Sequence, residues 1–435
     1  MKNKKSIGLW SAVSIGIGGM IGAGIFSILG VSAQIAGHAM YISFIIAGLI
    51  ALLCTYSYAK LGSKYPSAGG PVEFLVRGFG DNVISGGFNI LLWIGYVFAL
   101  SLYAKAFGGY AMTFLPSNAP GLWLNVFITM IILVFTGINF IGAKAVGKSE
   151  VVIVATKVVI LLVFIIAGFF FIDPSRLSFS NLPQVTNIFY GAAIVFLAYE
   201  GFGLITNTAE EMENPKKTLP RALFLAVIIT MIIYVLVSLT VLGNLPIGDI
   251  VGAKDYALAA AAEPFLGKIG FTFIAIAALF STSSAINATL YGGANVSYTI
   301  AKHGELPKIF ERKIWGRSTE GLFITSFVVL LFANFLELDS IAMLGSASFL
   351  LIYGAVNISH LKLYKETGAK PLIIVGSVVS CIIFFGVLTY YEINHSPVTL
   401  LILIFVIFGC FTFEWLYRKI SKRILKTRRF KEVRK

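Results

Sequence analysis

The chain has 435 residues, of which 57% are hydrophobic and only 12% are charged. A soluble protein of this length carries about twice that charged fraction, and apolar runs long enough to cross a bilayer recur along the whole sequence. These features exclude a soluble globular protein and predict an all-helical integral membrane protein. The formal net charge of +14 would suit a nucleic-acid partner only if the basic residues formed one patch.

Twelve transmembrane spans are expected, because twelve apolar stretches are separated by short polar loops. They cover residues 8–36, 40–63, 83–113, 121–142, 148–172, 188–210, 222–243, 268–300, 320–336, 339–360, 371–391 and 397–417. The three cysteines fall inside these stretches without metal-ligand or redox spacing. No metal site and no cofactor are therefore expected.

The basic residues are distributed unevenly between the two sides of this topology. If the chain starts inside, the outer loops hold only Arg176, Lys254 and Lys268. Apart from two lysines within spans, the other basic residues lie at the N-terminus, near the inner loops and in the tail from residue 418. Because positively charged loops stay in the cytoplasm, both termini are expected there. The positive charge thus indicates membrane topology, and no nucleic-acid partner is expected.

The first span contains the most unusual stretch of the sequence. Five of the thirteen residues 14–26 are glycine, the residue that most weakens a helix interior apart from proline. Since hydrocarbon offers no other partner for backbone groups, a helix that breaks at mid-depth is expected to line a cavity, as in secondary transporters. Close helix packing through small residues such as Gly18 and Gly22 is the alternative explanation.

The sixth span repeats this feature. Residues 196–203 place two glycines and the carboxylate of Glu200 in mid-membrane. Paired breaks in spans one and six predict two five-span halves of opposite orientation. The expected division is 1–172 and 173–360 for the halves, 361–417 for spans eleven and twelve, and 418–435 for a basic cytoplasmic tail.

Four motifs resemble those of the amino acid–polyamine–organocation (APC) superfamily. They lie at residues 18–26 in span one, 66–71 after span two, 210–217 after span six and 301–308 after span eight. Together they cover about the first 320 residues in the superfamily's order. The likeness is greatest to its archaeal proton-coupled amino acid transporters of broad specificity. The resemblance implies amino acid transport and a ten-helix inverted-repeat (LeuT-type) core with helices one and six broken.

The resemblance also implies a substrate site at the two breaks. Backbone N–H groups where span one restarts would bind the substrate carboxylate, because the positive end of a helix dipole points there. Carbonyl groups of an unwound segment in span six would bind the ammonium group. The expected donors are the N–H groups of Ala23, Gly24 and Ile25, the expected acceptors are the carbonyls of Leu197, Ala198 and Glu200, and Ile21 and Gly22 complete the first break.

Lys157 is the sharpest single candidate for coupling. It lies about ten residues into span five, roughly 15 Å from the inner end of the helix, and an ionisable group at that depth is by default a functional hypothesis. By resemblance, its ammonium would occupy the place where sodium-coupled relatives hold a cation, near the Gly18 carbonyl and the hydroxyls of Ser283 and Ser284. Proton coupling through Lys157, with no sodium site, is then expected. A permanently charged strut that only stabilises helix packing is the alternative.

Three further features leave alternatives open. Lys105, toward the outer end of span three, is expected to extend to the outer surface, with a gating or pathway role as the alternative. Glu200 could face the cavity, as a partner for a basic substrate side chain or as a second proton site, or could pair with a neighbouring helix. Phe196 and Phe202 flank the second break and are candidates for an aromatic gate.

The predicted function is secondary active import of amino acids by alternating access, across the plasma membrane of a prokaryote. An exchanger of the same fold, including one for cationic amino acids or polyamines, is the alternative. A transport-inactive nutrient sensor is the third reading. No catalytic constellation is present, so an enzyme is not expected. The expected partners are the amino acid and the lipid bilayer, for a monomer or homo-oligomer without a covalently linked accessory subunit.

Overall fold

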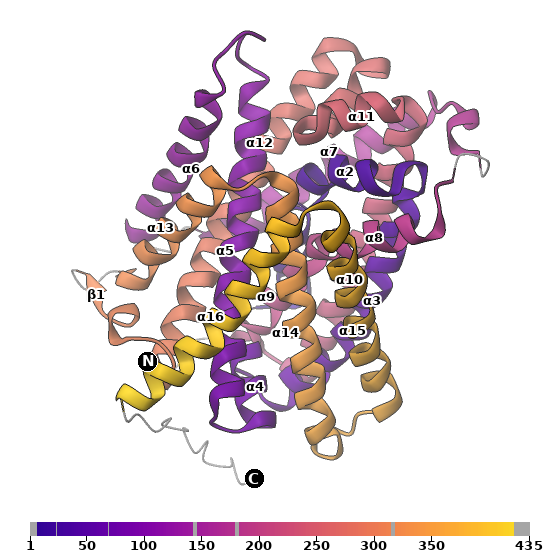
Figure 1. The fold of residues 1–435 in the computed structure, drawn as a ribbon. Helices are drawn as coiled ribbons and strands as arrows, with labels where there is room; N and C mark the ends of the chain where they lie inside the picture. The colour runs from indigo at the N-terminus through magenta and orange to yellow at the C-terminus, as the bar shows by residue number, and fades with distance from the viewer. Residues whose placement is uncertain are drawn as a thin grey trace.

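The computed structural model describes residues 7–22, 24–67, 69–141, 146–178, 182–314 and 318–421, without the side chains of residues 146–150 and 318. Almost all of the described chain is helical (Figure 1). The α-helices are α1 (Leu9–Met20), α2 (Gly24–Ala36), α3 (Met40–Lys64), α4 (Pro71–Phe79), α5 (Val83–Met112), α6 (Leu122–Ile141), α7 (Val146–Phe169), α8 (Val185–Val195), α9 (Gly203–Thr206), α10 (Pro215–Asn244), α11 (Ile247–Ala253), α12 (Ala257–His303), α13 (Glu320–Phe335), α14 (Leu338–Thr367), α15 (Pro371–His395) and α16 (Pro397–Ser421).

Short 3₁₀ segments and one small hairpin complete the fold. The 3₁₀ segments are η1 (Gly37–Ala39), η3 (Pro174–Leu177), η5 (Phe196–Phe202), η6 (Ala209–Glu211), η7 (Lys254–Tyr256) and η8 (Lys308–Phe310). Strands β1 (Lys313–Ile314) and β2 (Ser318–Thr319) pair antiparallel. The prediction of an all-helical membrane fold is confirmed.

The predicted spans coincide with helices of the described chain. Among the described residues, ten helical stretches are long and apolar enough to cross a membrane, and α1 and α13 are two shorter apolar helices. One difference concerns span eight, which was expected to begin at residue 268. The helix instead continues back to Ala257 through a bend at Gly267, whose φ of 62° lies in the left-handed region that favours glycine.

The two interrupted spans differ in form. Span one is broken outright, since α1 ends at Met20 and α2 begins at Gly24. Span six is not unwound as expected: α8 continues directly into the seven-residue 3₁₀ helix η5 and then into α9. A 3₁₀ stretch inside a long helix keeps most backbone groups bonded and often marks a functional hinge. The second break is therefore a tightened segment and not an open one.

Helices five spans apart pack against each other. α1 contacts η5, α3 contacts α10, α5 contacts α12, and α6 contacts α13. These contacts pair spans one to four with spans six to nine, which is compatible with two halves related by a twofold axis. The division into halves itself stays a prediction.

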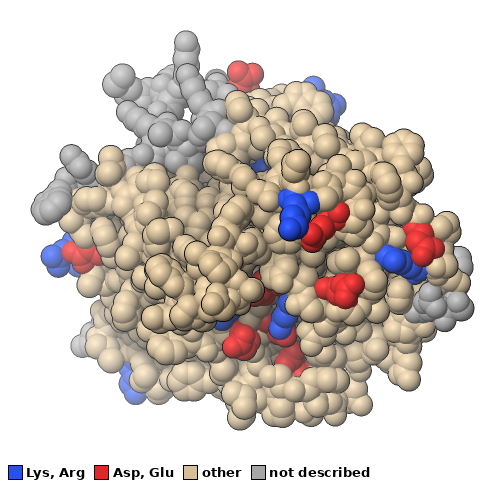
Figure 2. Space-filling model, turned by 90° about the horizontal axis from the view of Figure 1, so that it is seen from above, with Lys and Arg blue, Asp and Glu red and all other residues tan. Residues whose placement is uncertain are grey.

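The ends of the helices define two faces. α4, the connection between α14 and α15, and the end of α16 lie together at the bottom of Figure 1, and α11 lies at the top. The start of the described chain lies beside η6, because the N–H of Ile7 donates to the carbonyl of Glu211 at 3.3 Å. On the top face, acidic and basic side chains lie side by side (Figure 2). Lys254 and Asp339 form an ion pair at 2.6 Å.

Candidate functional site

The two breaks meet backbone to backbone in the interior of the bundle. A Cβ atom on Gly201 would lie 2.4 Å from the carbonyl carbon of Gly19 and 2.5 Å from the nitrogen of Met20. Real Cβ atoms do not approach backbone so closely, so glycine is required here to let η5 touch α1. The close approach explains why both spans carry glycine at mid-depth.

The second half of span one is held equally tightly. A Cβ on Gly24 would lie 2.9 Å from the Cα of Ala198, and one on Gly22 would lie 2.2 Å from the Cβ of Ala285 on α12. The first N–H groups of α2 therefore begin directly beside η5. Since the first turn of a helix has no internal partners for its N–H groups, this junction can bind an anionic group.

Side-chain hydroxyls fix the carbonyl groups at the breaks. Tyr234 on α10 donates to the carbonyl of Met20 and, at 3.1 Å, lies within hydrogen-bonding distance of the carbonyl of Ala198. Tyr353 on α14 donates to the carbonyl of Glu200 at 2.9 Å. One tyrosine thus bridges the two breaks.

A serine hydroxyl also bonds a carbonyl group at the first break. Ser281 on α12 donates to the carbonyl of Ile21 at 2.7 Å. Sequence reasoning missed Ser281, Tyr234 and Tyr353, because each lies in an apolar span with no motif around it. Of the three carbonyls expected to bind the substrate ammonium, that of Glu200 already accepts the hydroxyl of Tyr353, and that of Ala198 lies 3.1 Å from the hydroxyl of Tyr234.

The structure brings together the described members of the predicted substrate site. Ile21, Gly22, Gly24 and Ile25 form the first break, and all four are buried. Ala23 lies outside the described residues. The other members, Leu197, Ala198 and Glu200, lie buried on η5.

Glu200 is the least satisfied polar group of this region. The residue is 1% exposed, and neither of its carboxylate oxygens has a hydrogen-bond partner among the described residues. The alternative in which Glu200 pairs with a neighbouring helix finds no support in this part of the chain. A buried carboxyl group without a partner is costly, so this position can bind a proton or a cationic group.

The two gate candidates belong to one aromatic cluster. Phe202 stacks on Tyr353 with ring centroids 5.1 Å apart, and Phe196 meets the edge of the same ring at 5.6 Å. Tyr58 on α3 contacts both Phe202 and Tyr353. All four rings are buried. The cluster covers η5 on the side of α3 and α14, which suits a gate but equally suits a rigid core.

Lys157 contacts the Gly18 carbonyl, one of the groups that the coupling hypothesis places beside it. It is 4% exposed, and its ammonium donates to the carbonyl of Gly18 at 3.5 Å. Its helix, α7, packs against both α1 and α12. Ser284 on α12 is buried, and its hydroxyl has no hydrogen-bond partner among the described residues. Ser283 is half-buried.

The expectation for Lys105 is wrong. Its side chain does not extend to the surface, since the residue is 6% exposed and its ammonium donates to the carbonyl of Leu336 at 2.5 Å. Leu336 directly follows the last residue of α13, and a cation is favourable at a helix C-terminus. Lys105 therefore holds α5 against the end of α13.

Comparison with known proteins shows which family this chain belongs to. The sequence model of the amino acid permease family matches residues 7–420. The chain belongs to the amino acid permease family. This permease is also 48% identical to an uncharacterised protein of Methanocaldococcus jannaschii, over 97% of each chain. It is 36% identical to the inner membrane transport protein YbaT of Escherichia coli, over 88% of this chain and 89% of the relative.

A third relative is named for a solute that is not an amino acid. The methylthioribose transporter of Bacillus subtilis is 29% identical, over 83% of this chain and 82% of its own length. The permease is thus a multi-pass membrane transporter of amino acids or related solutes and not an enzyme. Among the described residues, no cluster of three histidine, cysteine or acidic side chains could hold a metal ion.

Proposed function

We propose that this permease imports amino acids together with protons, binding the substrate where its two interrupted helices meet. The N–H groups at the start of α2 would hold the carboxylate, and carbonyls of η5 the ammonium. The observation that carries the coupling is the ammonium of Lys157, buried among the helices and 3.5 Å from the Gly18 carbonyl near the first break. Loss of a proton from Lys157 would remove the positive charge from this bond, weaken it, and so loosen α1.

The arrangement of the spans supports the rest of this proposal. Residues 1–172 and 173–360 would form two inverted halves that rock around the breaks, with Phe196 and Phe202 closing the site. Both termini would face the cytoplasm, since the basic loops lie on their side. Ser283 and Ser284 would complete the polar surroundings of Lys157 when the lysine loses its proton.

The carboxylate of Glu200, which has no hydrogen-bond partner among the described residues, favours a second candidate function. A substrate with a basic side chain could pair with it, because a buried charge is stabilised by an opposite one. The permease would then carry cationic amino acids, and exchange of one cation for another would need no proton. The two candidates make different predictions for neutral substrates.

Uptake into proteoliposomes tests the first proposal. The panel would hold alanine, leucine, lysine, glutamate and methylthioribose, each with and without an acidic exterior. We expect an acidic exterior alone to drive accumulation of at least one amino acid in the wild type. Lys157→Gln should still bind substrate, seen as a thermal shift, but no longer accumulate it. Lys105→Gln, which alters the other buried lysine, is the matched control and should retain coupling.

Other outcomes would overturn parts of the proposal. Uptake that ignores the proton gradient and needs substrate inside the vesicle indicates an exchanger, with Lys157 as a strut. Uptake of methylthioribose alone would reject an amino acid substrate. Glu200→Gln separates the candidates: selective loss of lysine uptake indicates a cation partner, and loss of all gradient-driven uptake indicates a second proton site.

A further inference from the structure

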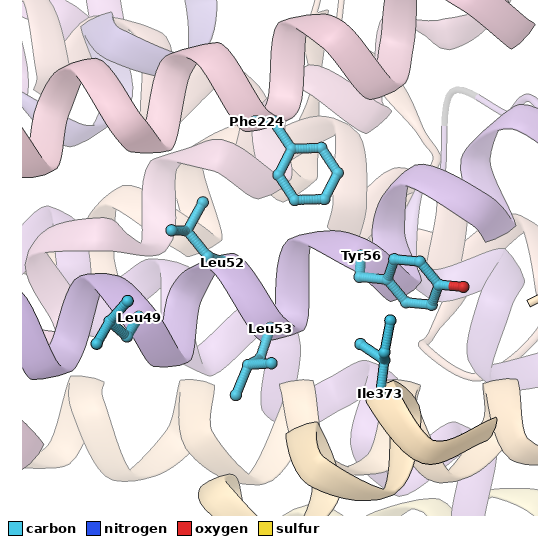
Figure 3. A pocket seen from close by; sticks show the side chains of 6 residues that line it. All are labelled: Leu49, Leu52, Leu53, Tyr56, Phe224 and Ile373. Carbon is cyan, nitrogen blue, oxygen red and sulfur yellow. The ribbon is translucent and has the colours of Figure 1, made fainter. Parts of the chain in front are cut away.

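A groove opens on the surface of the bundle between three helices. It has a volume of about 430 Å³ and lies over α3, with α10 on one side and α15 on the other (Figure 3). Its lining residues are Leu49, Leu52, Leu53, Tyr56, Phe224 and Ile373. α3 forms the floor because it packs against both other helices. Leu49 is 51% exposed, so the groove opens to the lipid that surrounds membrane-spanning helices.

Each of these helices carries a basic residue about one turn beyond the groove. Residues three or four apart share a helix face. The pairs of groove residue and basic residue are Tyr56 with Lys60 on α3, Phe224 with Arg221 on α10, and Ile373 with Lys370 at the start of α15. Three separate helices therefore contribute one positive charge each.

The three basic residues lie at the same end of the groove. The hydroxyl of Tyr56 accepts a bond from the backbone N–H of Lys370 at 2.8 Å, so the start of α15 lies beside α3. The end of α3 also meets the start of α10, since a Cβ on Gly62 would lie 2.6 Å from the side chain of Leu219. In Figure 3, Tyr56 and Ile373 occupy one end of the groove and Leu49 the other, and Phe224 lies between the two ends.

These charges are not neutralised by the described part of the protein. Arg221 and Lys370 are exposed, and neither they nor Lys60 form an ion pair with any described residue. The ammonium of Lys60 makes a 3.4 Å hydrogen bond to the carbonyl of Gly368, which leaves further donors. The neighbouring carboxylate of Glu366 accepts a hydrogen bond from the hydroxyl of Tyr65 at 2.5 Å.

We propose that this groove binds an anionic phospholipid. One acyl chain lies along the floor between Leu49 and Tyr56, and the phosphate lies among Lys60, Arg221 and Lys370. A lipid fits both features, because it joins an apolar chain to a negative head group. A soluble anion would not use the apolar floor, and an apolar helix of another protein would not need three positive charges at one end.

The position of the groove links the lipid to transport. Phe224 and Tyr234 lie on the same helix, ten residues and about 15 Å apart, and Tyr234 bonds both breaks. A lipid that packs against α3, α10 and α15 restrains α10 relative to α3. Lipid binding is therefore expected to affect the stability of the breaks as well as that of the bundle.

Native mass spectrometry of the purified full-length protein tests this proposal. The protein would be delipidated, and phosphatidylglycerol or phosphatidylcholine with the same acyl chains added back. We expect the wild type to retain more phosphatidylglycerol. The triple variant Lys60→Gln, Arg221→Gln, Lys370→Gln should lose this preference, by about fivefold for each residue. Leu53→Trp, which fills the groove, should reduce retention of both lipids.

The matched control is the triple variant Lys302→Gln, Lys308→Gln, Lys313→Gln, which removes three exposed charges away from the groove and should keep the preference. Equal retention of both lipids by the wild type would overturn the proposal. So would an equal loss of preference in both triple variants, because net charge would then explain the binding. A dimer that Leu53→Trp dissociates would show that a second copy of the chain occupies the groove.

Discussion

The carbonyl carbon of Gly19 lies 2.4 Å from the place that a Cβ atom on Gly201 would occupy. This contact joins the two interrupted spans at the point where the substrate is proposed to bind. Both partners are backbone atoms, so neither can move aside as a flexible side chain would. Packing of the site therefore depends on the absence of one methyl group.

Gly201→Ala should disable transport. Overpacking of this kind costs about 1–3 kcal/mol, and here the strain falls on the substrate site, so we expect at least about a tenfold loss of uptake. Gly203→Ala is the control, because its Cβ would meet only Tyr353 and Tyr58, at 3.6 and 3.8 Å. Equal uptake by the two variants, at equal amounts of folded protein, would contradict the close contact.

Tyr234→Phe tests the hydroxyl that bridges the breaks. The substitution keeps the ring and leaves the carbonyls of Met20 and Ala198 without this donor. A buried polar group left unsatisfied costs about 1–3 kcal/mol, so both thermal stability and substrate affinity should fall. Thermal unfolding with and without substrate measures the two effects.

The control for this variant removes a buried hydroxyl elsewhere. Tyr110→Phe loses the 3.3 Å bond to the carbonyl of Phe26, which lies on α2 beyond the break. Tyr110→Phe should lower the unfolding temperature without changing the increase in that temperature that substrate produces. If Tyr234→Phe behaves in the same way, the hydroxyl stabilises the bundle but has no part in the site.

The fold could be predicted from the sequence because its signals are local. Hydropathy locates each span without reference to its neighbours, and the glycines of residues 14–26 mark the first break directly. The second break was predicted in place but not in form, since glycine content does not distinguish a 3₁₀ segment from an open one. The choice between them depends on donors such as Tyr353, which is 153 residues away from Glu200 in the chain.

The side-chain partners of the site could not be predicted for the same reason. The bond between Tyr234 and Met20 joins residues 214 positions apart. Lys105 was misplaced because the nearest carbonyl, that of Leu336, belongs to a helix end 231 residues later. The sequence of a single protein indicates how deep in the membrane a lysine lies, but it does not indicate which other helix ends beside that lysine.

Lys105→Gln should destabilise the protein while leaving coupling intact. The variant weakens a charge-assisted bond to the end of α13, which contributes about 1.5–3 kcal/mol. Lys157→Gln should instead uncouple uptake from the proton gradient. Measuring unfolding temperature and gradient-driven uptake for both variants separates a structural lysine from a coupling one. Loss of coupling in Lys105→Gln at normal stability would reject this assignment.

The last prediction concerns Glu305, in the loop after α12. The pKa of its carboxyl group is raised from the usual 4.5 to about 8, chiefly by burial. The carboxylates of Glu414 and Asp81 act in the same direction, and the hydrogen bond from Asn89 and the charge of Arg418 act against it. The folded protein then binds a proton that the unfolded chain has lost between pH 4.5 and 8. Stability should therefore fall as the pH rises through that window, by up to about 1.4 kcal/mol per unit, and level off above it.

Glu305→Gln should remove this dependence, because a neutral amide replaces the carboxyl group and can still accept the 2.7 Å bond from Asn89. Unfolding temperatures measured from pH 5 to 9 in one detergent should converge at low pH and show the variant more stable at high pH. Glu213→Gln, which alters an exposed carboxylate, should follow the wild type throughout. Parallel curves for wild type and Glu305→Gln would mean that Glu305 is ionised in the folded protein, with Arg418 near enough to stabilise the charge.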